Sequence, residues 1–161
     1  MLDKKADFHL KVIFLFSLIA LISAYFIEHF LGHQPCNLCL IERIPYLLNI
    51  TLITMVLIFK KNQEFLILLL ILTSIFAFAI SLYHYGIEQG FFKESAVCDI
   101  KIFTENLTKE DLLKQLNVKI VSCKDVTFRI FGLSLTSINI ILCIFFIITF
   151  TKIWIKYEKN K

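Results

Sequence analysis

Four long stretches of this chain contain no Asp, Glu, Lys, Arg or His, and this feature limits the possible folds more than any other. A helix needs about 20 apolar residues to cross a hydrocarbon core of about 30 Å, so four spans occupy about half of the chain. Too little remains for a separate soluble domain of ordinary size. We therefore expect one membrane domain, residues 1–161, built as an all-α four-helix bundle. The uncharged runs are residues 12–27, 44–59, 65–83 and 130–151.

The overall composition excludes other classes of protein. The chain is 58% hydrophobic, with four glycines and two prolines among 161 residues, and its mean hydropathy is +0.76. Disordered chains have low hydrophobicity, and collagen-like or low-complexity chains contain much more glycine and proline. Neither class fits this sequence.

The charges at the borders of the runs predict the topology. Long side chains at a border can reach back to the membrane surface, which extends the spans. Basic residues are densest near the span ends at the two termini and at Lys60–Lys61, which favours the cytoplasm for that side. The expected spans are about 12–31, 43–60, 65–83 and 130–151, with extracytoplasmic loops at 32–42 and 84–129.

Four of the five cysteines fall in the two loops on the opposite side. Cys36 and Cys39 lie in the first loop, and Cys98 and Cys123 lie in the second. An even set on one side, with none in the other loop or the tails, indicates an oxidising compartment. Cys143 lies within the fourth span, where we interpret it as a small buried side chain.

The spacing of Cys36 and Cys39 suits thiol–disulfide chemistry. Two cysteines three positions apart can close a disulfide, and a helix N-terminus there would lower the thiolate pKa. Arg43 lies one helical turn beyond Cys39, which places a cation near the thiolate. Two other interpretations remain open: an inert structural disulfide, or a zinc site in which Cys98 and Cys123, or His33, complete four ligands.

Three segments resemble the DsbB family of quinone-coupled disulfide oxidoreductases. Residues 36–43, Cys-Asn-Leu-Cys-Leu-Ile-Glu-Arg, are similar to the family's C-x-x-C motif and the E-R that follows it. Residues 83–90 resemble the outer end of its third span, and residues 131–135 with Asn139 resemble the start of its fourth. The vitamin K epoxide reductase-like group also has four spans and a C-x-x-C motif, but there the active pair lies late in the chain.

The resemblance implies a relay of disulfide exchange. Cys98 and Cys123 would accept electrons from a DsbA-like periplasmic thioredoxin-fold oxidase, with Cys98 forming the mixed disulfide. Cys123 would then exchange with Cys36, which leaves Cys39 as the thiolate facing a bound quinone. The quinone, either ubiquinone or menaquinone, would carry the electrons into the respiratory chain.

The resemblance also suggests residues near the quinone and a location. Arg43 would bind or polarise the quinone ring, and His84 matches a family position near it, although simple placement at the membrane interface explains His84 equally well. Glu42 is either part of the quinone site or a structural partner of Arg43. The expected location is a bacterial inner membrane, with both termini cytoplasmic and the cysteine loops periplasmic. We expect lipid contacts, no metal ion and no nucleic-acid partner.

The second loop carries a signal for a short amphipathic helix. Thr108 and Asp111 form a capping pattern, and apolar residues follow at helical spacing. We expect this helix either to lie on the membrane surface and keep Cys123 within reach of Cys36, or to pack on the protein or remain a solvated loop. The apolar positions are Leu112, Leu113, Leu116 and Ile120.

Overall fold

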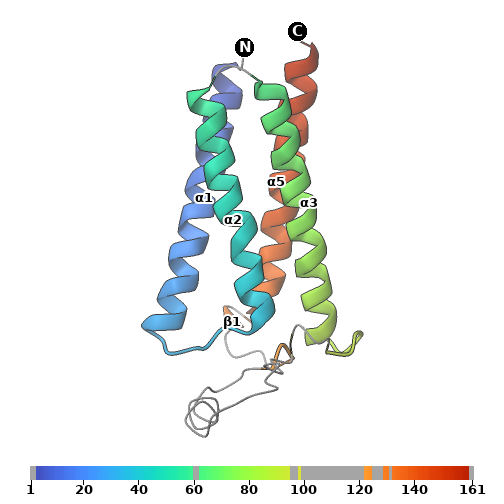
Figure 1. Ribbon diagram of the computed structural model, residues 1–161. Helices are drawn as coiled ribbons and strands as arrows, with labels where there is room; N and C mark the ends of the chain where they lie inside the picture. The colour runs from blue at the N-terminus through green and yellow to red at the C-terminus, as the bar shows by residue number, and fades with distance from the viewer. Residues whose placement is uncertain are drawn as a thin grey trace, which may run out of the picture.

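Four long helices run side by side in a computed structural model of the chain (Figure 1). Each is long and apolar enough to cross a membrane, which confirms the predicted class, an all-α membrane protein with a four-helix bundle. The helices are α1 (Lys4–His29), α2 (Asn37–Ile58), α3 (Gln63–Glu88) and α5 (Leu135–Lys159). The structure describes residues 3–59, 62–94, 98, 122–124, 129–130 and 132–159.

The helices do not coincide with the uncharged runs of the sequence. At the cysteine-containing end, α2 starts at Asn37 and α3 continues to Glu88, so polar residues lie within the helical turns there. The fourth helix instead starts late, because β1 (Arg129–Ile130) pairs antiparallel with β2 (Leu133–Ser134) just before it. The amphipathic helix expected at residues 106–120 lies outside the described residues.

Both chain ends lie at one end of the bundle (Figure 1). Lys156 Nζ of α5 pairs with Asp3 Oδ2, just before α1, at 2.8 Å. The start of α2 and the end of α3 lie at the other end, which we call the cysteine end because Cys36, Cys98 and Cys123 are buried there in one cluster. The bundle thus separates the termini from the loop cysteines.

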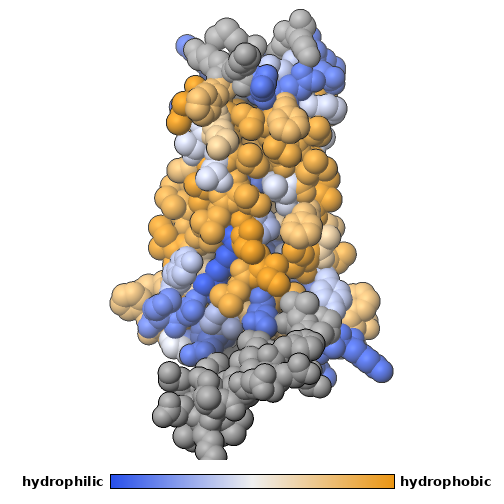
Figure 2. Space-filling model, in the orientation of Figure 1, coloured by the Kyte–Doolittle hydropathy of each residue, from blue (hydrophilic) through white to orange (hydrophobic). Residues whose placement is uncertain are grey.

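The outside of the bundle is apolar along most of its length. Figure 2 shows hydrophobic residues over the middle of the molecule and hydrophilic residues gathered toward the two ends. Large apolar side chains such as Ile22, Phe76 and Ile141 are more than half exposed. In water such a surface would be unfavourable, so these side chains face lipid.

The interior is packed unevenly. A large hydrophobic cluster joins all four helices and includes Leu10, Ile53, Leu70 and Phe150, each fully buried. Helix α5 packs most extensively on α3, whereas α1 packs mainly on α2 and only slightly on α5. Toward the cysteine end, α1 and α5 therefore leave room for the cavity described below.

Candidate active site

Cys36 and Cys39, here called the inner pair, lie at the start of α2. Cys36 is the N-cap residue, and its sulfur accepts a hydrogen bond from the backbone N–H of Cys39 at 3.3 Å. The two Sγ atoms are 2.8 Å apart and both thiols are free. The helix start supplies unpaired N–H groups, so it stabilises negative charge on the Cys36 sulfur.

His84 reaches the inner pair from α3. Its Nε2 lies 3.5 Å from Cys36 Sγ, and its side chain is buried. The hydrogen bond with the Cys39 thiol lowers the pKa of Cys36 most, His84 lowers it further, and burial opposes both, leaving the pKa of Cys36 at about 4. Cys36 is therefore the thiolate of the reduced pair.

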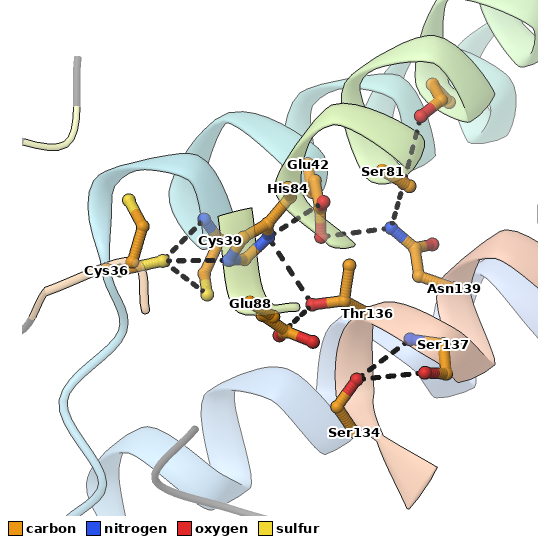
Figure 3. A network of polar contacts seen from close by, with 12 residues as sticks. Cys36, Cys39, Glu42, Ser81, His84, Glu88, Ser134, Thr136, Ser137 and Asn139 are labelled. Carbon is orange, nitrogen blue, oxygen red and sulfur yellow. Dashed lines mark hydrogen bonds and ion pairs between the residues drawn. The ribbon is translucent and has the colours of Figure 1, made fainter. Parts of the chain in front are cut away.

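Glu42 and Asn139 connect three helices behind the inner pair (Figure 3). Glu42 Oε1 lies 3.1 Å from His84 Nδ1, while Glu42 Oε2 accepts a hydrogen bond from Asn139 Nδ2 at 3.0 Å. Asn139 also donates to Ser81 Oγ at 2.7 Å and accepts a bond from the Tyr46 hydroxyl. This network fixes the position of the His84 ring between α2 and α5.

Arg43 is bound on its α1 side. Its Nη1 pairs with Glu28 Oε2 at 2.6 Å, and its guanidinium lies over the Tyr25 ring, 4.9 Å from the centroid. The Arg43 side chain is 13% exposed. A guanidinium has five N–H donors, so one ion pair uses only part of its donor capacity.

Cys98 and Cys123 form a disulfide, here called the loop disulfide, with 5.7 Å between their Cα atoms. Both residues are buried in the same apolar cluster as Cys36, Leu38 and Ile87. The fold therefore brings the loop disulfide and the inner pair together at the cysteine end. Within the loop disulfide, Cys98 and Cys123 are 25 positions apart in the sequence.

A cavity of about 410 Å³ lies beside these groups. Its apolar wall comes mainly from α1 and α5, and the inner pair, Arg43, His84 and Cys123 also line it. Ligand sites are typically apolar cavities of about this size with a few polar groups that orient the ligand. The α1 and α5 wall includes Phe16, Ile19, Ala20, Ala24, Ile138 and Leu142.

The same residues offer a set of metal-binding atoms. The sulfurs of the inner pair and a ring nitrogen of His84 lie within 4.8 Å of one another. Zinc accepts two thiolates and an imidazole, but structural sites use a fourth ligand. His33, one of the residues that the sequence suggested as a ligand, lines the cavity but is not in this group.

Thr136 and Glu88 belong to the same network but were not predicted from the sequence. Thr136 donates a hydrogen bond to Glu88 Oε1 at 2.6 Å, and its oxygen lies 3.4 Å from His84 Nδ1 (Figure 3). Glu88 is four positions after His84, so the two share a face of α3. Polar residues inside an apolar membrane helix are energetically costly, so they often mark a functional site. Thr136 and Asn139 are two such residues, three positions apart in α5, and their presence could have pointed to this site.

Comparison with known proteins identifies the family. The model of the family described as disulfide bond formation protein DsbB matches residues 7–153. The chain belongs to the DsbB family. It is also similar to uncharacterized protein RP370 of Rickettsia prowazekii (strain Madrid E), with 31% identity over 152 residues, 93% of this chain and 88% of the relative. Membership in the DsbB family, together with the four apolar helices, indicates that the chain is a multi-pass membrane protein that takes part in disulfide-bond formation. The family also indicates thiol–disulfide oxidoreductase chemistry.

Proposed function

We propose that this protein reoxidises a DsbA-like dithiol oxidase and passes the electrons to a bound quinone. The observation that carries the proposal is the position of the inner pair, whose sulfurs lie 2.8 Å apart on the wall of an apolar cavity. Cys123 of the loop disulfide lines the same cavity. In this arrangement the inner pair can exchange with the loop disulfide on one side and transfer electrons to a membrane-soluble acceptor in the cavity on the other.

The loop disulfide would receive electrons first. A thiolate of the partner attacks Cys98, and the released Cys123 thiolate attacks the oxidised inner pair at Cys36. While Cys36 is joined to Cys123 its sulfur carries no charge, so Cys39 is the remaining thiolate of the inner pair. Cys39 lies in the first turn of α2 and lines the cavity.

The residues around the cavity fit a quinone. Its walls are apolar along α1 and α5, and cationic or hydrogen-bonding groups occur beside the inner pair. When bound, a quinone supplies a two-electron acceptor for the thiolates. Arg43, held by Glu28, would orient a carbonyl oxygen, and His84, held by Glu42, would hold a proton at Nε2. The weak contact between α1 and α5 offers a route from the lipid.

We also propose that the cysteine end faces the periplasm and both termini face the cytoplasm. The basic residues near the termini support this orientation, and disulfide exchange requires an oxidising compartment. In intact spheroplasts, a membrane-impermeant maleimide should label a cysteine introduced at Gln89, an exposed residue just after α3 at the cysteine end, in a variant whose native cysteines are replaced by serine. A cysteine introduced at Asn62, at the other end of the bundle, should be labelled only after lysis.

The direct test is anaerobic quinone reduction by the purified protein, with a reduced thioredoxin-fold oxidase as donor. Wild type should form quinol, and both Cys39→Ser and Cys98→Ser should abolish its formation. Cys143→Ser is the matched control, because Cys143 is a buried free thiol of α5 outside both pairs. Absence of quinol with wild type and several donors would refute the proposal.

Metal binding by the inner pair is the second candidate function, favoured by the three donor atoms within 4.8 Å. Under reducing conditions with added zinc, this alternative predicts one tightly bound ion per chain, lost in His84→Gln. Zinc binding together with absent quinol formation would replace the redox proposal. Quinol formation without retained zinc would exclude the alternative.

A further inference from the structure

The segment that follows α3 holds the turn that contains Cys123. Glu94 Oε1 accepts hydrogen bonds from the Ser122 hydroxyl and from the Lys124 backbone N–H, the latter at 3.2 Å. The Lys124 N–H is shared with Ser122 Oγ, 3.1 Å away. One carboxylate oxygen therefore binds the residues on both sides of Cys123, and we call Glu94, Ser122 and Lys124 the clasp.

The chain before Glu94 is fixed to the end of α3. Phe91 and Phe92 both donate their backbone N–H to the Gly86 carbonyl, at 2.8 and 3.1 Å. The Phe92 ring stacks on Tyr83, with 5.7 Å between the ring centroids. It also packs so closely on Gly86 that a Cβ there would lie 2.2 Å from Phe92 Cδ2. Glu94 follows this fixed segment directly, so its carboxylate is held close to α3.

Helix α3 also contacts the inner pair. His84 Nε2 of this helix lies 3.5 Å from Cys36 Sγ, and Cys36 and Cys123 are buried in one apolar cluster. Both cysteines are therefore positioned relative to the same helix. None of the hydrogen bonds of the clasp passes through the sulfur of Cys123, so breaking the loop disulfide removes none of them.

Opening of the loop disulfide removes the covalent bond that holds Cys123. In the proposed function, a partner thiolate bonds to Cys98, and the electron pair of the broken S–S bond leaves on Cys123. The Cys123 thiolate can then return to Cys98 or advance to Cys36. Both attacks occur within one complex, so the outcome depends on the effective concentration of each target sulfur, which falls as the connecting chain gains freedom.

We propose that Glu94 is a positioning residue that keeps Cys123 beside Cys36 while Cys98 is bound to the partner oxidase. The inference rests on the proposed exchange between the two cysteine pairs. In that step the Cys123–Cys36 bond forms, the Cys36–Cys39 bond breaks, and the electron pair stays on Cys39 as a thiolate. The step moves no proton, and Glu94 takes part only as a hydrogen-bond acceptor.

The effective concentration of the Cys36 and Cys123 thiols tests the clasp. A Cys39→Ser, Cys98→Ser background leaves these two as the loop thiols, and glutathione buffers of known ratio set the equilibrium of the Cys36–Cys123 disulfide. Alkylation of the free thiols followed by mass spectrometry measures the oxidised fraction. The net contribution of a hydrogen bond corresponds to about three- to tenfold in an equilibrium constant, so Glu94→Ala should lower the effective concentration by about that factor.

Matched variants separate the hydrogen bonds of the clasp from general effects on the loop. Glu94→Gln keeps an oxygen acceptor and should retain the effective concentration of the background. Ser122→Ala should lower it, and should add little to Glu94→Ala, because both substitutions remove the same contact. Lys93→Ala, at an exposed position beside Glu94 and outside the clasp, is the control and should change nothing.

An unchanged effective concentration in Glu94→Ala would overturn the proposal. A value as low in Glu94→Gln as in Glu94→Ala would overturn the hydrogen-bonding role of Glu94. The measurement uses neither quinone nor a partner oxidase. A failure of quinol formation by the wild type therefore contradicts the proposed function, whereas an unaltered effective concentration in Glu94→Ala contradicts only the clasp.

Discussion

Cys36 is the group whose chemistry is set most strongly by its neighbours. Its pKa of about 4 is far below the value of about 8.5 for an unperturbed cysteine. A lowered pKa keeps the thiolate at all pH values above it and protonates the sulfur only as the pH falls through it. In the reduced protein, alkylation of Cys36 by iodoacetamide should therefore keep its neutral-pH rate until the pH approaches 4.

Mass spectrometry of the fragmented peptide can separate Cys36 from Cys39 in this experiment. Replacing His84 by Gln removes one of the contacts that lower the Cys36 pKa, so the loss of reactivity should begin at a higher pH. An alkylation rate that is already half lost near the ordinary cysteine pKa in wild type would contradict the assigned thiolate.

Arg43 should act on quinone and not on the thiols. Lysine cannot reproduce the planar guanidinium that pairs with Glu28 and stacks over Tyr25. A charge-assisted hydrogen bond contributes about 1.5–3 kcal/mol, so Arg43→Lys should raise the KM for a short-chain quinone about tenfold or more. The pH profile of Cys36 alkylation should not change. Tyr25→Phe keeps the aromatic face and should behave like wild type.

Asn139 joins α5 to α2 and α3. Its amide donates to Glu42 and Ser81 and accepts from Tyr46, so Asn139→Leu leaves several groups without that partner. Each unsatisfied buried group costs about 1–3 kcal/mol, and the variant should be destabilised by at least one such increment. Thermal unfolding in detergent measures this loss. Ile141→Ala, on the lipid-facing side of α5, is the control and should change stability much less.

The four helices could be predicted from the sequence, but the exact start of α5 and the residues that meet between helices could not. Apolar length alone requires membrane helices, so the four spans followed from runs without charge. The start of α5 at Leu135 did not, because the β1–β2 hairpin uses apolar residues of the same run. Contacts such as Thr136 with Glu88 join residues 48 positions apart, and only helix packing determines which polar faces meet.

At the scale of the whole molecule, the residues of the candidate site could be predicted from the sequence, but the cavity that they line could not. The C-x-x-C motif and its family resemblance led to Cys36, Cys39, Glu42, Arg43 and His84, and the fold places them around one cavity. The cavity could not be predicted from the sequence, because its wall consists of the same kinds of apolar side chain as the lipid-facing surface. Small residues of α1 and its weak contact with α5 create that space.

Filling this space should separate the two halves of the proposed reaction. Ala24 lines the cavity from α1, and Ile22, two positions earlier, is exposed on the outside. Ala24→Phe should place a ring in the cavity, whereas Ile22→Phe should add one toward lipid. Overpacking costs about 1–3 kcal/mol, so quinol formation by Ala24→Phe should fall about tenfold or more through weaker quinone binding.

Exchange between the loop disulfide and the inner pair should continue in both variants, because α1 supplies neither cysteine pair. Gel analysis after thiol trapping, with a reduced thioredoxin-fold oxidase and no quinone, measures that exchange. If Ala24→Phe slowed exchange as much as quinol formation, the substitution would be acting on the whole cysteine end. If it changed neither rate while keeping the bundle folded, the acceptor would have to bind elsewhere than between α1 and α5.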